Sequence, residues 1–367
     1  DDDDADSQVT MVEPVGSMLT NVSGRTTQVE KGALSSSSSA ATVIDPAAIE
    51  EDARKAVPMT KAGTAIDVRP GFLLHNEAVP ASHTGKQQHD WDDLDANDQR
   101  DPMMVSEYIH DIIAYMRTIE VQTLPSPDYM DKQTELTWSM RGILVNWIIQ
   151  VHYQLRMFPE TLFLTVNIID RFLSLRYVSV ARLQLVGLTA LLVASKYEEM
   201  ASPSIHDLVY LAGNGYTENE ILDAEIFMLR VIDFDMSYPS PMTFLRRVSK
   251  AENYNIQTRT VAKFLMEISL VDHRFLRFVP SQLAASAILL ARRMLSCGQW
   301  NANLRYYSGY TEKELEPIVE LYVEYLAMPC AHPALQKKYA HRRFLKASMF
   351  CREWVGRYYP EIVAKEM

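Results

Sequence analysis

The 367-residue sequence has few cysteines and no apolar stretch as long as a membrane-spanning helix. Its three cysteines, Cys297, Cys330 and Cys351, are scattered along the second half of the chain. They are too few for a disulfide framework or a zinc site, and they indicate a reducing compartment. The longest nearly apolar run, 183–194, is shorter than the roughly 20 residues that cross a bilayer, and no signal peptide opens the sequence. We therefore predict a core helix there and no membrane partner.

Motifs that carry catalysis are also missing. The sequence has no glycine-rich phosphate loop, no His-Glu-x-x-His pair and no Cys-x-x-Cys motif. The nine histidines are dispersed, and a lone histidine such as His152 is more often structural than a metal ligand. Glu198 and Glu199 are adjacent carboxylates, but neighbours in sequence point apart on a helix. We predict no enzymatic activity, no cofactor and no metal site.

The formal charge of -11 is unevenly distributed. Residues 1–101 hold 19 acidic and 8 basic side chains, and the remainder is neutral. This balance disfavours nonspecific binding to nucleic acid. A basic cluster near the C-terminus could contact phosphate, but acids elsewhere can balance it, so a solvated helix face is the simpler interpretation. The cluster comprises Lys337, Lys338, His341, Arg342, Arg343 and Lys346.

The first part of the chain predicts little structure. Residues 1–100 include the serine run 35–39 and lack helix or strand periodicity, so we predict a disordered acidic tail. Residues 101–136 are predicted to form an N-terminal helix and a linker. An apolar stripe at helical spacing places this amphipathic helix at 104–121, where its apolar side could lie against the domain or against a partner. The stripe consists of Val105, Tyr108, Ile109, Ile112, Ile113 and Met116.

The rest of the chain predicts an all-α fold of two tandem five-helix domains. Residues 137–238 form the first domain, 239–358 the second and 359–367 a C-terminal tail. An internal repeat supports two copies of one fold, because 189–194 resembles 286–291 at an offset of 97 positions. The helix at 140–151 is apolar nearly all round, which is typical of a helix at the centre of such a domain.

Two sets of charged residues stand out in this apolar context. Arg141 lies inside the central helix, and Asp170 lies in an equally apolar helix, so the two could form a buried ion pair. Alternatively, Arg141 reaches water along its stem. Lys196 and Glu225 lie on two further apolar helices and could present opposite charges to a partner. An internal salt bridge between them is the equal alternative.

Several motifs resemble the cyclin box. They are Met140–Trp147, Ile168–Leu173, Leu183–Gly187 and Ala194–Glu199. The segments Asp101–Tyr108 and Tyr238–Arg247 narrow the resemblance to B-type, mitotic cyclins, most like fungal ones. The resemblance covers about residues 92–360 and leaves only the tail outside.

This resemblance implies two stacked cyclin-box domains with no catalysis of their own. It implies a regulatory subunit that binds and activates a cyclin-dependent kinase, docks substrates and controls the G2/M transition, in nucleus and cytoplasm. Recognition by the ubiquitin-ligase machinery is implied as well. Arg141 and Asp170 match the family's buried ion pair. The positions that match kinase-binding residues are Lys196, Glu225, Tyr197, Phe234, Met236 and Tyr108.

A second surface is implied by the same resemblance. It is a shallow apolar patch that docks short Arg-x-Leu-type motifs of substrates and inhibitors, and it would explain why the central helix is apolar on so many sides. Its matching positions are Met140, Ile143, Leu144, Trp147, Gln150 and Gln184. Gln150 replaces a glutamate that many relatives have, which weakens the expected preference for a basic docking residue. Asn146 stands where the family usually has aspartate.

One alternative function belongs to another class. A transcription-factor-like adaptor could use the same double helical fold to bind DNA. It would need a strongly basic face, and a neutral folded part behind an acidic tail argues against that function.

Overall fold

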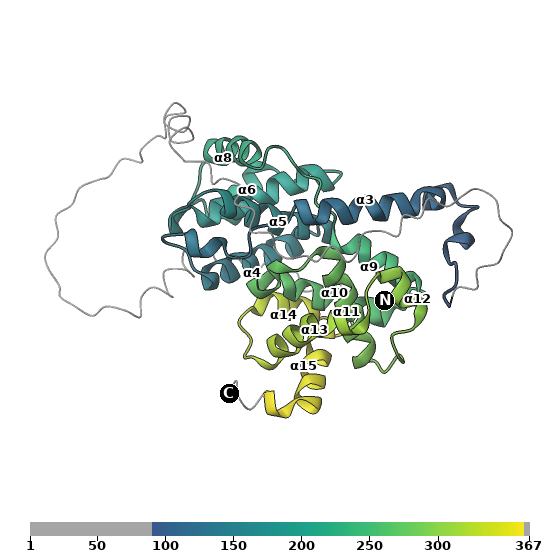
Figure 1. The fold of residues 1–367 in the computed structure, drawn as a ribbon. Coiled ribbons are helices and arrows are strands. Elements are labelled where there is room, and N and C mark those ends of the chain that lie inside the picture. Colours follow the sequence, from purple (N-terminus) through teal and green to yellow (C-terminus); the bar gives the residue numbers. More distant parts are fainter. Residues whose placement is uncertain (1–89, 363–367) are drawn as a thin grey trace, which may run out of the picture. The chain divides into compact units, whose positions relative to one another are not determined.

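The computed structural model describes residues 90–362, and every regular element in that range is a helix (Figure 1). The all-α prediction is confirmed. The first domain contains the five predicted helices, and each begins or ends at a recognisable signal. Proline opens α5, and Thr217 with Glu220 forms the capping box of α8. The five are α4 (Trp138–Gln154), α5 (Pro159–Leu175), α6 (Val180–Glu198), α7 (Ile205–Leu211) and α8 (Glu218–Val231).

The second domain repeats this order and then continues. Its helices are α9 (Pro241–Lys250), α10 (Ile256–Val271), α11 (Pro280–Met294), α12 (Ala302–Ser308), α13 (Glu312–Ala327), α14 (Pro333–Ala340) and α15 (Ala347–Tyr358), with 3-10 turns η5 (His273–Arg277) and η6 (Arg342–Phe344). The α12 helix begins and ends 97 positions after α7, and α10 begins 97 positions after α5. The predicted repeat is therefore present. Two helices, α14 and α15, follow the five that were predicted.

The N-terminal helix begins later than predicted. Two 3-10 turns, η2 (Pro102–Met104) and η3 (Ser106–Tyr108), precede α3 (Ile109–Gln122). Val105, between the turns, has a left-handed backbone with φ of 48°. A β-branched residue in that conformation interrupts the helical path, so the predicted start at 104 was wrong.

The predicted boundary of the acidic tail at residue 100 was also wrong. The Trp91 ring stacks on Tyr306 of α12 with 3.5 Å between ring centroids. Asp95, in the 3-10 turn η1 (Asp95–Asp98), is buried and accepts hydrogen bonds from Arg247 and Lys250 of α9 at 2.5 and 2.6 Å. These contacts hold the segment 90–98 against the second domain. The remainder of the predicted tail, 1–89, lies outside the described residues.

The predicted C-terminal tail also starts too early. Tyr359 and Ile362 pack against the hydrophobic core, and the Tyr359 ring lies 5.6 Å from that of Trp354. Residues 363–367 lie outside the described range.

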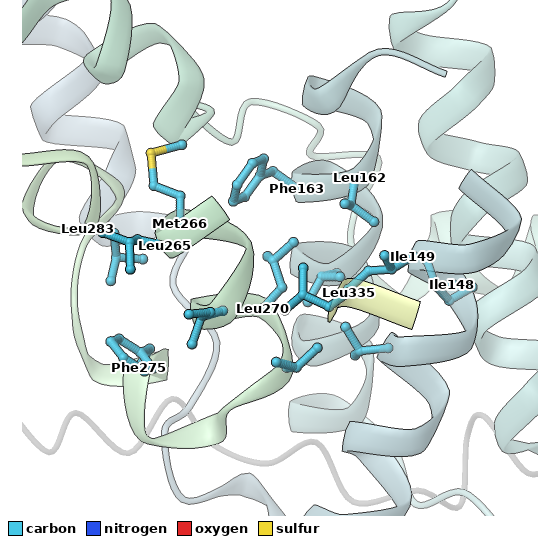
Figure 2. Close-up of a cluster of buried hydrophobic side chains, with 14 of the residues drawn as sticks. Ile148, Ile149, Leu162, Phe163, Leu265, Met266, Leu270, Phe275, Leu283 and Leu335 are labelled. Carbon is cyan, nitrogen blue, oxygen red and sulfur yellow. The ribbon is translucent and has the colours of Figure 1, made fainter. Parts of the chain in front are cut away.

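The α4 helix is buried because helices from both domains pack around it. It contacts α5 and α6 of its own domain, and α10 and α14 of the second. Figure 2 shows Ile148 and Ile149 of α4 in one cluster with Phe163 of α5, Leu270 of α10 and Leu335 of α14. This shared core joins the two domains directly.

The α6 helix is long and apolar enough to cross a membrane by length and composition alone. However, 72% of its most apolar window is buried inside the fold. This burial is typical of a core helix, as the sequence predicted for 183–194.

The predicted buried ion pair is present between α4 and α5. Arg141 Nε and Nη2 donate to the two carboxylate oxygens of Asp170, each at 2.7 Å, and Tyr129 Oη donates to Asp170 Oδ1 at 2.8 Å. Both ionic side chains are at most 2% exposed. Burial acts to lower the pKa of Arg141, but the Asp170 carboxylate more than offsets it and raises that pKa. Arg141 therefore does not reach water.

Removal of Asp170 should destabilise the chain strongly. We expect Asp170→Ala to lower the free energy of unfolding by about 3–5 kcal/mol, because it leaves the Arg141 guanidinium charged, buried and unpaired. Urea denaturation measures this change. The control is Arg182→Ala, which breaks the exposed pair Arg182–Glu220 and should cost at most about 1 kcal/mol. Equal losses in the two variants would contradict a special role for the buried pair.

Two histidines, the buried His152 and the half-buried His332, predict acid sensitivity. Burial lowers the pKa of His152 and of His332 from 6.5 to about 4. Between these values the unfolded chain binds more protons than the folded chain, so stability is complete above pH 6.5 and declines as the pH falls towards 4. For His152 the loss at pH 4 is about 3 kcal/mol. We expect His152→Gln to flatten this part of the pH profile in denaturation experiments, and an unchanged slope would contradict the assignment.

Candidate functional site

The charged pair considered in the sequence forms a salt bridge between α6 and α8. Lys196 Nζ donates to the two carboxylate oxygens of Glu225 at 2.6 and 2.8 Å. The Glu225 side chain is 11% exposed, whereas that of Lys196 is 45% exposed. Of the two interpretations that the sequence left open, the internal bridge is therefore present. Lys196 nevertheless remains accessible, as an ammonium group held in a fixed position at the surface.

Exposed aromatic side chains lie close to this pair in the chain. Tyr197 follows Lys196 and is 59% exposed, and Phe234, just after α8, is 64% exposed. Asp233 and Phe234 both have left-handed backbones, with φ of 56° and 54°. Arg171 Nη1 donates to the Asp235 carbonyl oxygen at 2.8 Å, which fixes the turn that carries Phe234. The strained turn thus presents an aromatic ring to solvent.

A groove of about 670 Å³ lies beside Tyr197. Tyr115 of α3, Tyr197 of α6 and Met236 of the inter-domain linker all contribute to its walls. Glu198 also lines it, and burial together with nearby Glu160 raises the pKa of the Glu198 carboxyl. The groove therefore brings α3 together with two residues, Tyr197 and Met236, that the sequence had assigned to one interface.

The α3 helix is anchored at one end and uncovered at the other. At its C-terminal end Glu120 is buried and accepts hydrogen bonds from Ser281 N and Oγ at 2.9 and 2.8 Å, at the start of α11. At its N-terminal end Tyr108 is 55% exposed, and Ile112 and Tyr115 of α3 are 38% and 63% exposed. Ile112 belongs to the apolar stripe seen in the sequence but was not assigned to an interface, and Tyr115 lies outside that stripe.

The α4 patch is only partly accessible. Met140, Ile143 and Gln150 are half-buried, whereas Leu144 and Trp147 are at most 1% exposed. Gln184 of α6 is also buried, at 6% exposure. Trp147 Nε1 and Gln184 Nε2 are buried without a hydrogen-bond partner in the described part of the chain. Both donors are buried from solvent, so the accessible part of this patch consists of Met140, Ile143 and Gln150.

The breadth of the apolar surface on α4 has another cause than the one the sequence suggested. Within α4, a Cβ added to Gly142 would lie 2.9 Å from His332 Nε2, at the start of α14. On the side facing α6, a Cβ added to Gly187 would lie 2.7 Å from Leu144 Cδ1. Neighbouring helices of both domains therefore cover most sides of α4, and a docking surface is not needed to explain its composition.

Asn146 has a structural role. Its Oδ1 accepts a hydrogen bond from Ala334 N at 3.0 Å, in the first turn of α14. The N-cap residue of α14, His332, makes no side-chain capping bond of its own. Asn146 thus caps a helix of the second domain from within the first.

No catalytic arrangement appears among the described residues. Residues 90–362 contain no cluster of three potential metal ligands. Glu199, a member of the adjacent carboxylate pair, accepts hydrogen bonds from Phe158 N and Thr161 Oγ1 at the start of α5. Its role is to cap that helix.

These features define a class of protein. The chain combines two copies of a five-helix domain with an uncovered amphipathic helix before them, and the first copy carries a fixed charged pair beside exposed aromatic side chains. Exposed apolar surfaces of this kind are typical of proteins that bind other proteins. Comparison with known families agrees with this class. The N-terminal cyclin domain matches residues 111–237, and the C-terminal cyclin domain matches residues 239–353. The chain belongs to the cyclin family.

Fungal mitotic cyclins are similar to the chain over most of its length. It is 55% identical over 282 residues to the G2/mitotic-specific cyclin cdc13 of Schizosaccharomyces pombe, covering 77% of this chain and 58% of that protein. It is 53% identical over 267 residues to the G2/mitotic-specific cyclin-B of Emericella nidulans, covering 73% and 56%. The resemblance seen in the sequence is therefore confirmed. The chain spans less than two thirds of each of these relatives.

A solved structure supports the fold. The X-ray structure of a viral cyclin from herpesvirus saimiri matches with a TM-score of 0.53 and 19% sequence identity, covering 57% of this chain and 94% of that one. The fold prediction of tandem cyclin domains is confirmed. These relatives do not favour the transcription-factor-like alternative.

Substitution of Asn146 should test the cap between domains. We expect Asn146→Ala to lower the free energy of unfolding by about 1 kcal/mol, because the Ala334 N–H loses its acceptor. Asn146→Asp should stay closer to the parent chain, since it keeps the acceptor and places negative charge at a helix N-terminus. Urea denaturation at neutral pH compares the three proteins. A larger loss in the aspartate variant than in the alanine variant would contradict the capping role.

Proposed function

We propose that the chain is the regulatory subunit of a cyclin-dependent kinase. In this proposal it has no catalytic activity, activates the kinase, docks substrates and inhibitors, and controls the G2/M transition in nucleus and cytoplasm. Recognition by the ubiquitin-ligase machinery is part of the same proposal. The names of the fungal relatives support a mitotic role. The observation that carries the proposal is the accessible Lys196–Glu225 pair among exposed aromatic side chains.

The charged pair suits an interface with a helix or loop of the kinase. Glu225 holds the Lys196 ammonium with two short hydrogen bonds, so the ammonium loses little freedom when it binds a carbonyl or carboxylate. Tyr197 and Phe234 offer large apolar surfaces that become buried on association. Such anchors dominate the binding energy of protein interfaces.

The uncovered face of α3 extends this surface. Tyr115 lines the same groove as Tyr197 and Met236, and Tyr108 and Ile112 precede it on the apolar face of the helix. An interface over α3, α6 and α8 would contact the kinase at several points at once. Contact at several points favours one kinase conformation over others.

Activation then follows from differential affinity. Phosphoryl transfer by protein kinases needs a Lys–Glu ion pair whose glutamate lies on a mobile regulatory helix. A cyclin that prefers the kinase conformer with this helix inward shifts the kinase population towards that conformer. The size of the shift is set by the ratio of the cyclin's affinities for the two conformers. The chain itself supplies no catalytic group in this scheme.

Substrate docking is proposed for the α4 patch. Ile143, Met140 and Gln150 provide the accessible part, and the unpaired donors of Trp147 and Gln184 lie in its buried part. A short peptide with a leucine side chain would cover the apolar atoms of the accessible part. Because Gln150 is uncharged, it does not select a basic residue as a glutamate would.

The kinase interface is tested by removing the charged pair. We expect Lys196→Ala with Glu225→Ala to lower kinase binding and activation by more than about tenfold, because an anchor at the interface centre is lost. The matched control is Arg182→Ala with Glu220→Gln, which breaks the other salt bridge between α6 and α8 while glutamine keeps the capping box. Co-purification with the kinase and phosphorylation of a substrate measure the effect. Full activity of the first variant would refute the assigned interface.

A further inference from the structure

A group of basic side chains lies in the last turn of α14 and in the segment that follows it. Lys337, Arg342, Arg343 and Lys346 are exposed, and none forms a salt bridge with a described residue. The sequence predicted a solvated helix face for this cluster, with its charge balanced by acids elsewhere in the fold. Lys338 is instead buried, with its Nζ 2.6 and 2.8 Å from the Glu267 oxygens. These four side chains are therefore solvated, as predicted, whereas Lys338 is not, and none of the four is paired with an acid in the described part of the chain.

The segment 341–346, here called the basic loop, has a defined conformation. Its 3-10 turn η6 is capped by His341 Nδ1, which accepts a hydrogen bond from Arg343 N at 3.2 Å. Phe344 anchors the turn, with its ring 4.8 Å from that of Tyr339. The Arg343 guanidinium lies 5.8 Å from the Phe344 ring centroid. The charged groups are thus displayed on a fixed turn.

The basic loop adjoins the end of the docking patch. Four of the accessible side chains of α4, Met140, Ile143, Gln150 and Tyr153, are spaced by three or seven positions and so lie on one side of the helix, here called the α4 stripe. Tyr153, near the C-terminal end of α4, lies 6.2 Å from Phe344 between ring centroids. The stripe therefore leads from the apolar patch to the basic loop.

The direction of α14 explains this continuity. Its first turn lies beside Gly142 and Asn146, in the first half of α4, and the loop after its last turn reaches Tyr153. The two helices run in the same direction. Their C-terminal ends, where partial negative charge accumulates, therefore point towards the basic loop, and part of its positive charge offsets theirs. Arg342, Arg343 and Lys346 lie beyond α14, and together they carry more positive charge than the two helix ends require.

We infer that the α4 stripe and the basic loop form one surface for a peptide whose apolar docking motif is joined to acidic or phosphorylated residues. This inference rests on the proposed docking function of the α4 patch. Guanidinium groups pair with carboxylates and phosphates through two parallel hydrogen bonds. Gln150 adds no negative charge between patch and loop that would repel such a peptide. The apolar side chains of the α4 stripe and the net charge of -11 favour a peptide over nucleic acid as the ligand.

Peptide binding to the full chain tests this inference. Fluorescence anisotropy would compare three labelled peptides that share one Arg-x-Leu-type motif and continue with neutral, glutamate or phosphoserine residues. Each peptide would be made in two versions, with the neutral, glutamate or phosphoserine residues before or after the motif. We expect one anionic arrangement to bind about 3- to 10-fold tighter than the neutral peptide at low salt, from two exposed ion pairs. The gain should shrink as salt is added.

Two double variants test whether the basic loop causes the tighter binding of anionic peptides. Arg342→Gln with Arg343→Gln should remove the preference for anionic peptides and leave binding of the neutral peptide unchanged. Arg100→Gln with Lys313→Gln removes the same charge at two exposed positions outside the loop and should preserve the preference. Urea denaturation would verify that both variants fold like the parent chain.

Each outcome decides between the two levels of the proposal. If the neutral peptide does not bind the parent chain, the docking function itself is refuted. If it binds but anionic residues add nothing, only the present inference fails. Equal loss in the control variant would show that net charge, and not the loop, causes the preference. Duplex DNA binding that needs Arg342 and Arg343, without any gain for peptides, would overturn the inference in favour of nucleic acid.

Discussion

The structure depends on the buried pair between Arg141 and Asp170. Beyond the two hydrogen bonds to Asp170, Arg141 Nη1 donates to the Leu270 carbonyl oxygen at 2.9 Å, on α10 of the second domain. A single guanidinium therefore satisfies a carboxylate in one domain and a backbone group in the other. A buried guanidinium costs free energy unless its charge is paired and its N–H groups are hydrogen-bonded. Arg141 is therefore stable in this position only when Asp170 and the Leu270 carbonyl are both in place. This requirement fixes the register of α4 against both domains.

The second domain contains an equivalent of this pair. Glu267 of α10 lies 97 positions after Asp170 of α5, at the same offset as the sequence repeat. Each carboxylate is buried and accepts a hydrogen bond from a tyrosine, Tyr129 or Tyr339, and each also binds a cation. In the second domain the cation is Lys338 of α14, a helix with no counterpart among the first five. The buried carboxylate thus holds α14 parallel to α4 and places the basic loop at its end.

The sequence predicted those features that depend on local pattern. Arg141 and Asp170 were found because isolated charges in apolar helices need partners, and the repeat was found because 189–194 resembles 286–291. The prediction failed where distant contacts decide. Lys338 was grouped with surface lysines because nothing near it in sequence reveals Glu267. Residues 90–98 were assigned to the tail because their order comes from Arg247, Lys250 and Tyr306, more than 150 positions away.

A rigid frame matters for the proposed activity because a regulatory subunit acts only through differential affinity. A ligand that moves a kinase from mostly inactive to mostly active must prefer the active conformer by about 10⁴-fold. A surface that adapted to every conformer would bind them equally and shift nothing. Here Glu225 fixes Lys196, Arg171 fixes the turn of Phe234, and Glu120 fixes α3. The buried network keeps these supports in register, so the surface can reject kinase conformers that do not fit it.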